Sequence, residues 1–428
     1  MLSTFTILLF LCQVSTLYSK ILCNDSDHLR RIRTPGDIII GGILPIHGRV
    51  ELINRTQPGP AHCSEFDIST FIQAQAMVYS INQINNSTLL PGIKLGYEIY
   101  DSCSDVINAV EATMQLISKL NSSINSVEVH CNYSAYLPRI KAVVGGVYSE
   151  ISIVIARLLN LYLIPQISYS SSAEILSNKE KFASFFRTIP SDKHQTFAMI
   201  QLILYLNWNW VAVISTEDDY GQSAMNSFIL HAEKHSICVD FHTLLPVHNS
   251  ELFKAKINET AQKIQNSTAQ VMVTFIRSTD ITALFKLLIE KKVNKTWIAS
   301  DAWSSSRTIS TLKQIEKIGT ILGFSFKDGK ISNFKQYLEK LVMHSKNVDK
   351  FTEEFLSITN NRNGTQTGKK LQFKKSHEYE KINANINEAF TYGVYLTIHA
   401  ITHALRRMLN CDYKKCNRNF DFPPWQII

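Results

Sequence analysis

A serine at a predicted strand–helix junction is the strongest candidate for binding a small anion. Ser149 lies in Tyr148-Ser149-Glu150, directly after an apolar stretch that ends in Gly145-Gly146 and directly before a run with helical periodicity. At such a helix start, its hydroxyl and the free backbone N–H groups could hold a carboxylate against the positive helix end. The same serine would also suit an ordinary helix N-cap, so both interpretations stand at this point.

Other polar residues at element boundaries have equally simple structural explanations. Ser170 and Ser172 follow a predicted strand and would suit a turn. Asp192 and Asp301 would each suit a helix cap, and Tyr220 would be a loop aromatic. Taken alone, these residues predict no particular ligand.

The acidic run Glu217-Asp218-Asp219 suggests glycosidase or metal chemistry at first sight, because paired carboxylates can act as acid and base. Consecutive loop residues point in different directions, however, and no second motif supplies a nucleophile, so a solvated turn is favoured. The sequence has no GxSxG, P-loop, dinucleotide-binding, CxxC or HExxH motif. We therefore expect neither an enzyme nor a cofactor, and no metal site is assigned.

The composition limits the class of protein. The chain has 428 residues, 45% of them hydrophobic and 19% charged, with a net charge of +8. These values exclude disorder, and the length indicates two or three domains. Basic residues do not alternate with aromatic ones in a stripe, so we expect no nucleic-acid partner.

Short apolar runs alternate with amphipathic stretches along most of the chain, and this alternation indicates βα units. The predicted strands cover residues 38–44, 94–100, 142–146, 163–168, 211–215, 271–276 and 297–300. The predicted helices cover residues 71–84, 106–120, 151–161, 194–206, 223–235 and 281–290. One sheet cannot comfortably hold this many βα units. We therefore predict an α/β fold with two doubly wound lobes and a ligand between them. Residues 54–61 and 345–381 are expected to be loops.

The N-terminus predicts secretion. Residues 1–19 combine a short apolar run with small and polar residues before a plausible cut at Ser19, as a signal peptide does. No later segment has the length and apolarity of a membrane span. Glycosylation sequons support an extracellular chain. The acceptors we favour are Asn54, Asn86, Asn121, Asn258, Asn266, Asn294 and Asn363, with Asn85 overlapping Asn86.

Removing the signal peptide leaves seven cysteines, an odd number that implies either a bond to another chain or a partner cysteine outside this sequence. They are Cys23, Cys63, Cys103, Cys131, Cys238, Cys411 and Cys416. Cys411 and Cys416 lie on one polar turn, and this spacing allows a local disulfide.

Several segments together resemble the ligand-binding ectodomain of class C G-protein-coupled receptors, above all the amino-acid receptors of that class. They follow the family's order over nearly the whole chain. The segments are DIIIGGILPIH (37–47), INNSTLLPGIKLGYEIYDSC (84–103), KAVVGGVYSEIS (141–152), IPQISYSSSAEILSNK (164–179), FFRTIPSDKHQ (185–195), WNWVAVISTEDDYG (208–221), TWIASDAWSSS (296–306) and IGTILGFSF (318–326).

The resemblance implies the family's bilobed fold, a periplasmic-binding-protein-like type I clamshell called the Venus flytrap. We expect lobe 1 in residues 20–191 and 323–428, with lobe 2 in residues 192–322. The family's cysteine-rich module and seven-helix domain have no counterpart here, and lobe 1 would be truncated. A G protein would act only through that absent seven-helix domain.

The resemblance also implies a site for a free L-α-amino acid, with a basic ligand and divalent cations as further possibilities. Ser149 matches the carboxylate-binding serine, and Ser172 matches a residue that holds the amino-acid backbone. Asp192 matches a residue that helps to hold the ammonium, and Asp301 matches a lobe 2 carboxylate that meets the ammonium or a basic side chain on closure. Tyr220 matches a tyrosine that covers the ligand.

Departures from the family pattern limit the transfer. Gln73 and Ser69 stand where one branch has a pocket tryptophan and an arginine, so the full ligand set of that branch is not carried over. Ser170 is a candidate ligand residue at a position where an acidic residue would recognise a basic side chain. Glu174 and Glu388 are the alternative carboxylates.

The resemblance further pairs Cys63 with Cys103 and makes Cys131 the cysteine for a bond to a second copy through lobe 1. Cys238 would pair with the absent cysteine-rich module. Two other functions stay open: a secreted, truncated amino-acid-binding or decoy protein, and, less favoured, a secreted hydrolase.

Overall fold

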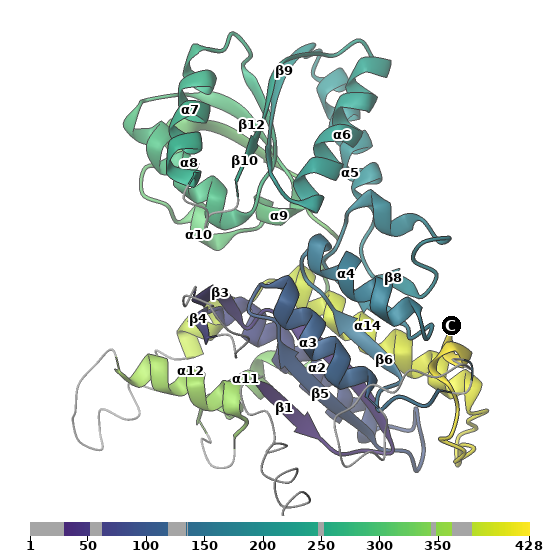
Figure 1. The fold of residues 1–428 in the computed structure, drawn as a ribbon. Helices are drawn as coiled ribbons and strands as arrows, with labels where there is room; N and C mark the ends of the chain where they lie inside the picture. The colour runs from purple at the N-terminus through teal and green to yellow at the C-terminus, as the bar shows by residue number, and fades with distance from the viewer. Residues whose placement is uncertain are drawn as a thin grey trace, which may run out of the picture.

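The chain forms two bodies, each built around its own β-sheet, which lie one above the other in Figure 1. The computed structural model describes residues 30–51, 62–118, 134, 136–246, 252–343, 348–361 and 379–428. We call the bodies the six-stranded body and the five-stranded body, after their sheets. The α/β fold class with two parallel, helix-covered sheets is confirmed.

The six-stranded sheet has the order β1-β5-β2-β6-β7-β8. Only β1 runs antiparallel to its neighbour, β5. The strands are β1 (Arg31–Thr34), β2 (Ile38–Leu44), β5 (Leu95–Asp101), β6 (Ala142–Gly145), β7 (Gln166–Ser168) and β8 (Phe185–Arg187). A separate hairpin joins β3 (His47–Glu51) to β4 (His62–Phe66).

Helices cover both faces of this sheet because its central strands are apolar on both sides. Ile40 of β2 packs against α2 and α14, whereas Ile43 of the same strand packs against α3 and α4. The helices of this body are α2 (Ile68–Asn85), α3 (Val106–Ile117), α4 (Ser149–Asn160), η2 (Glu174–Ser177), α11 (Phe334–Met343), α12 (Lys350–Asn361), α14 (Glu388–Met408) and η4 (Pro424–Ile427).

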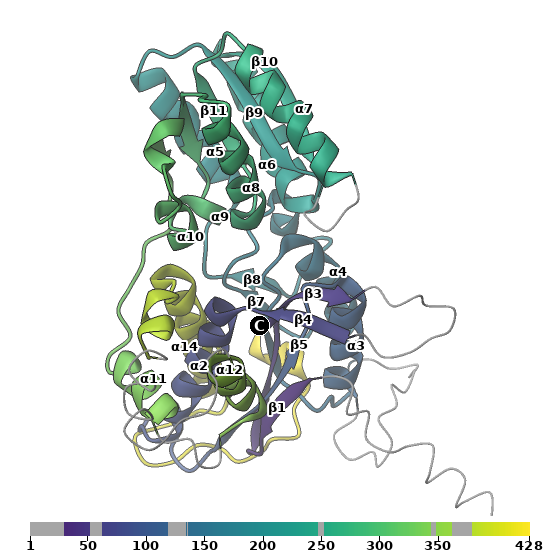
Figure 2. The same ribbon diagram turned by 90° about the vertical axis from the view of Figure 1, so that its left-hand side faces the viewer.

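The five-stranded sheet is parallel throughout, in the order β10-β9-β11-β12-β13. Its strands are β9 (Trp210–Thr216), β10 (Cys238–Leu245), β11 (Val271–Phe275), β12 (Lys295–Ala299) and β13 (Gly319–Gly323). Its helices are α5 (Asp192–Tyr205), α6 (Asp219–Lys234), α7 (Phe253–Asn266), α8 (Ser278–Glu290), α9 (Asp301–Ser304), α10 (Arg307–Ser310) and η3 (Ile315–Ile318). Figure 1 shows α7 and α8 on one side of this sheet and α5 and α6 on the other, and Figure 2 views the sheet from the side of α7 and α8.

The prediction of a loop over residues 345–381 is wrong in part, because α12 lies inside that stretch. Phe351 and Phe355 recur at a four-residue step and are both 1% exposed. The Phe355 ring stacks on Phe71 of α2 with centroids 5.3 Å apart. The sequence did not predict α12, because its few apolar residues are separated by polar ones. Residues 345–347, 362–378 and 54–61 lie outside the described residues.

Within the described ranges, every helix is too short or too polar to cross a membrane.

Candidate functional site

Most of the expected ligand residues lie where the two bodies meet, at or near the starts of helices that follow parallel strands. Ser149 begins α4, Asp192 begins α5 and Asp301 begins α9, while Tyr220 is the second residue of α6. Figure 1 shows α4 at the upper edge of the six-stranded body and α9 at the lower edge of the five-stranded body. Strand ends and helix starts of the two sheets therefore face each other.

Ser149 is not the N-cap of its helix, because Tyr148 holds that position. The Ser149 hydroxyl instead accepts a 3.3 Å hydrogen bond from the backbone N–H of Ala173. The neighbouring Ser172 accepts, through its carbonyl oxygen, a 2.9 Å hydrogen bond from the N–H of Asp192. These contacts connect the start of α4 to the start of α5, and Ser149 and Ser172 are both buried.

Two buried carboxylates, Asp192 and Asp301, form the acidic part of the cluster. Gln195 donates a 2.6 Å hydrogen bond through Nε2 to Asp301 Oδ1, whereas neither carboxylate oxygen of Asp192 has a hydrogen-bond partner among the described residues. Burial raises the pKa of Asp301 to about 6. Burial, followed by repulsion from Asp301, raises the pKa of Asp192 well above its usual value. The Ser172 side chain and the charge of Arg187 oppose this rise, but neither carboxylate forms an ion pair among the described residues.

Tyr220 lies beside these carboxylates and donates a 2.9 Å hydrogen bond from its hydroxyl to Ser300 Oγ. Burial and the charges of Asp301 and Asp192 raise the pKa of Tyr220, so the phenol is neutral. Its proton is donated to Ser300, and its oxygen can still accept from a further donor. The cluster thus offers hydroxyl groups at the Ser149 end and carboxylates at the Asp301 end.

Two of the expected residues are not linked to this cluster by any described contact. The backbone N–H of Ser170 donates to Ser168 Oγ, and the residue is partly buried. Glu388 pairs with Lys335 at 3.3 Å on the surface of the six-stranded body. The alternative carboxylate Glu174 begins η2, where its N–H donates to Ser223 Oγ.

Sequence reasoning missed Gln195 and Arg277. Gln195 lies three residues after Asp192 on α5, and residues at that spacing share a helix face, so the signal was present. Arg277 forms an ion pair with Glu150, from which it is 127 residues away in sequence. Spacing alone carries no signal for such a pair.

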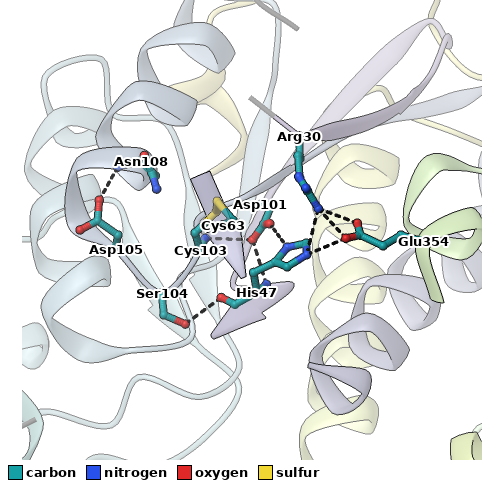
Figure 3. The surroundings of a disulfide bond; sticks show 9 residues. All are labelled: Arg30, His47, Cys63, Asp101, Cys103, Ser104, Asp105, Asn108 and Glu354. Carbon is teal, nitrogen blue, oxygen red and sulfur yellow. Dashed lines mark hydrogen bonds and ion pairs between the residues drawn. A yellow bond between two sulfur atoms is a disulfide. The ribbon is translucent and has the colours of Figure 1, made fainter. Parts of the chain in front are cut away.

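A second buried polar cluster surrounds the Cys63–Cys103 disulfide (Figure 3). His47 Nδ1 lies 2.5 Å from Asp101, and its Nε2 lies 3.1 Å from Glu354 of α12. Burial alone lowers the pKa of His47, but the hydrogen bonds to Asp101 and Glu354 outweigh it and raise the pKa to about 9. The protonated imidazole therefore links α12 to the end of β5, beside the disulfide.

The structure also shows where the remaining described cysteines lie. Cys411 and Cys416 form a disulfide with Cα atoms 4.0 Å apart. Cys238 has an exposed thiol, and Cys131 and Cys23 lie outside the described residues. Asp101 lies against the sulfur atoms of Cys63 and Cys103, but the disulfide occupies both sulfurs, so this group is not a metal site.

Four of the glycosylation candidates lie on described and exposed positions: Asn86, Asn258, Asn266 and Asn294. Asn85 uses its amide to bond both backbone groups of Leu95, so Asn86 is the better acceptor of the overlapping pair. Asn54, Asn121 and Asn363 lie outside the described residues. Attachment of glycans at any of these sites stays a prediction.

Comparison with known proteins places the chain among receptors. Residues 72–427 match the model of a family described as the receptor family ligand binding region. G-protein coupled receptor family C group 6 member A from Homo sapiens is 39% identical over 99% of this chain and 48% of its own length. The extracellular calcium-sensing receptor from Mus musculus is 35% identical over 89% of this chain and 38% of its own length. Taste receptor type 1 member 3 from Mus musculus is 31% identical over 93% of this chain and 48% of its own length. The chain therefore spans less than half the length of these relatives.

Proposed function

The chain belongs to the family of receptor ligand-binding regions, in its class C G-protein-coupled receptor branch, and we propose that it binds a free L-α-amino acid outside the cell. The class assignment also agrees with the absence of enzyme motifs in the sequence.

The observation that carries this proposal is the buried carboxyl group of Asp192, which lies near Asp301 and forms no ion pair and no hydrogen bond of good geometry among the described residues. Two carboxyl groups buried together either take up a proton or need a cation against them, because burial and mutual repulsion disfavour two charges. The ammonium of an amino acid is such a cation, and it is small enough to use both carboxylates and the Tyr220 hydroxyl. Charge-assisted hydrogen bonds of this type are the strong ones in proteins.

The opposite end of the cluster suits the α-carboxylate. Ser149 begins α4, a helix of 12 residues whose N-terminus carries partial positive charge. Among the described residues, its hydroxyl accepts the 3.3 Å bond from Ala173 and donates to none, so its proton can reach an anion. An amino acid would thus lie with its carboxylate at α4 and its ammonium at Asp192 and Asp301.

Binding of this kind would close the two bodies on the ligand. Ser149 and Ser172 come from the six-stranded body, whereas Asp192, Tyr220 and Asp301 come from the five-stranded body. We propose that these bodies are lobes 1 and 2, hinged at the crossings after β8 and after β13. Signalling to a G protein would require a seven-helix domain, and dimerisation would use lobe 1.

Calorimetric titration of Ser149→Ala with L-amino acids tests the site. Loss of a charge-assisted hydrogen bond should weaken binding by at least about 1 kcal/mol. Ser306→Ala is the matched control, because Ser306 also stands at the start of a short helix but makes no side-chain cap. Equal affinities for both variants would remove Ser149 from the site.

Small-angle scattering tests closure separately. The radius of gyration should decrease when saturating amino acid is added, because both bodies contribute contacts to the ligand. An unchanged radius in a sample that calorimetry shows to be saturated would contradict closure.

A further inference from the structure

Arg277 connects the two bodies beside the proposed carboxylate end of the site. It is the N-cap of α8, at the end of β11 in the five-stranded body. Its Nη2 donates to Glu150 Oε1 of α4 in the six-stranded body. The same guanidinium pairs with Asp218 of its own body, with Nη2 and Oδ2 2.8 Å apart.

Arg277 also covers the first turn of α4. Its guanidinium carbon lies 4.3 Å from the centre of the Tyr148 ring, a distance typical of a cation–π contact. Tyr148 and Glu150 are the residues on either side of Ser149. One side chain from the five-stranded body therefore holds both neighbours of the proposed carboxylate-binding serine.

The Arg277–Glu150 pair is partly shielded from water, so the attraction between its charges is stronger than in a fully exposed pair. The side chains of Arg277 and Glu150 are 18% and 21% exposed. Glu150 Oε2 is buried and has no hydrogen-bond partner among the described residues, so Arg277 is the cation that compensates this carboxylate. Removal of one partner from such a pair leaves an uncompensated charge and is more costly than the pair is stabilising.

Asp218 already provides Arg277 with an anionic partner inside the five-stranded body. It caps α6 by accepting from Gly221 N–H at 2.7 Å, and it would neutralise Arg277 without any help from Glu150. The ion pair between Arg277 and Glu150 is therefore a second ion pair of Arg277, and it forms only while the two bodies are in contact. A second link, from Glu174 N–H to Ser223 Oγ at 3.3 Å, crosses the same boundary.

We propose that Arg277 is a positioning residue of the amino-acid site, which holds the first turn of α4 against the five-stranded body before a ligand arrives. This inference rests on the proposed function. The Arg277–Glu150 pair raises the population of closed molecules, and a ligand that binds closed molecules gains affinity in proportion to that population.

The test uses the secreted chain with Glu150→Gln, Arg277→Gln and the double variant. Glu150→Gln is the informative single change, because it removes the link between bodies and leaves the Arg277–Asp218 pair in place. Glu259→Gln is the control, since Glu259 forms an exposed ion pair with Lys263 on α7, a helix of the five-stranded body. Scattering without amino acid and calorimetry with L-alanine and L-arginine are measured for each.

Each single variant should increase the radius of gyration without ligand and weaken the tighter-binding probe about tenfold, equal to about 1.4 kcal/mol. The double variant should match the single ones, because both changes remove the same link. Additive effects, or a Glu150→Gln protein indistinguishable from Glu259→Gln, would overturn the proposal.

The two proposals fail in different ways. If the parent chain binds neither probe, the proposed function is contradicted for those amino acids, while the scattering comparison still tests whether Arg277 holds the bodies together. If the radius increases but affinity for a bound probe is unchanged, Arg277 has no positioning role at the site. Should Arg277→Gln fail to be secreted, Glu150→Gln decides the question alone.

Discussion

Replacing Asp301 by asparagine should stabilise the unliganded chain and at the same time weaken amino-acid binding. Burial raises the pKa of Asp301 from its ordinary 3.8 to about 6. One pKa unit corresponds to about 1.4 kcal/mol, so ionised Asp301 costs the folded chain about 3 kcal/mol. The charge of Asp301 also raises the pKa of Asp192, so its removal relieves both residues.

The net gain should be smaller than that cost. An asparagine oxygen can still accept from Gln195 Nε2, but it replaces a carboxylate that also accepts from backbone N–H groups of Asp301 and Ala302. We expect a net stabilisation of about 1–2 kcal/mol near pH 7 and a rise of a few degrees in the midpoint of thermal unfolding. Affinity for an amino acid should fall at least about tenfold, because the ammonium loses a charged partner.

The pH dependence provides the sharper test. A folded carboxyl group with a raised pKa binds its proton more tightly than the unfolded chain does, so stability of the unliganded parent rises as pH falls from about 6 towards about 4. The Asp301→Asn variant should lack the gain in stability that protonation of Asp301 gives the parent over this pH range. Thermal unfolding at about pH 7 and about pH 5 measures it. Asp328→Asn, on an exposed position, is the control. A variant that is less stable than the parent near pH 7, or that binds amino acid equally well, would refute the reasoning.

Three further changes test other parts of the molecule. Phe355→Ala should destabilise the six-stranded body by about 3–5 kcal/mol in denaturant unfolding, because the ring is buried against Phe71. Ile358→Ala on the same helix removes a 37% exposed side chain and should have little effect. Equal losses for the two variants would argue against α12 as part of the core. His47 has a raised pKa of about 9, so its contribution to stability is full below its ordinary pKa of 6.5 and is lost as pH rises through about 9. The thermal midpoint should therefore fall more between about pH 8 and about pH 10 in the parent than in His47→Gln, and parallel curves would contradict this. Non-reducing electrophoresis should show a dimer that Cys131→Ser converts to a monomer, and a dimer that survives this substitution would refute the assignment of Cys131.

The fold was largely predictable because buried parallel strands are short apolar runs. The runs at residues 38–44, 142–146 and 271–276 all became central strands. β10 was missed because it lies at the edge of its sheet and carries polar residues such as Asp240 and His242. α7 was missed because its buried face is divided among lysine, glutamine and asparagine residues.

The placement of the candidate residues at strand–helix junctions was predictable from chain order, whereas their ligand roles come from the family resemblance and stay predictions. Pairing across the bodies was not predictable. Ser149, Asp192 and Asp301 all begin helices after parallel strands, and such positions converge in any doubly wound fold. The Arg277–Glu150 pair depends on how two separately built sheets face each other. Periodicity within one segment holds no information on that arrangement.

The order of the segments along the chain also sets the order in which the two bodies can fold during translation. The strands of the five-stranded sheet occupy one continuous stretch that is complete once β13 has emerged from the ribosome. The six-stranded body must wait for α14, which packs on α2, and for the carbonyl of Phe422, which accepts a 2.6 Å hydrogen bond from Lys141 Nζ. One apolar face of the first sheet is therefore exposed to chaperones during much of synthesis, and substitutions in α14 should lower secreted yield even when they leave amino-acid affinity intact.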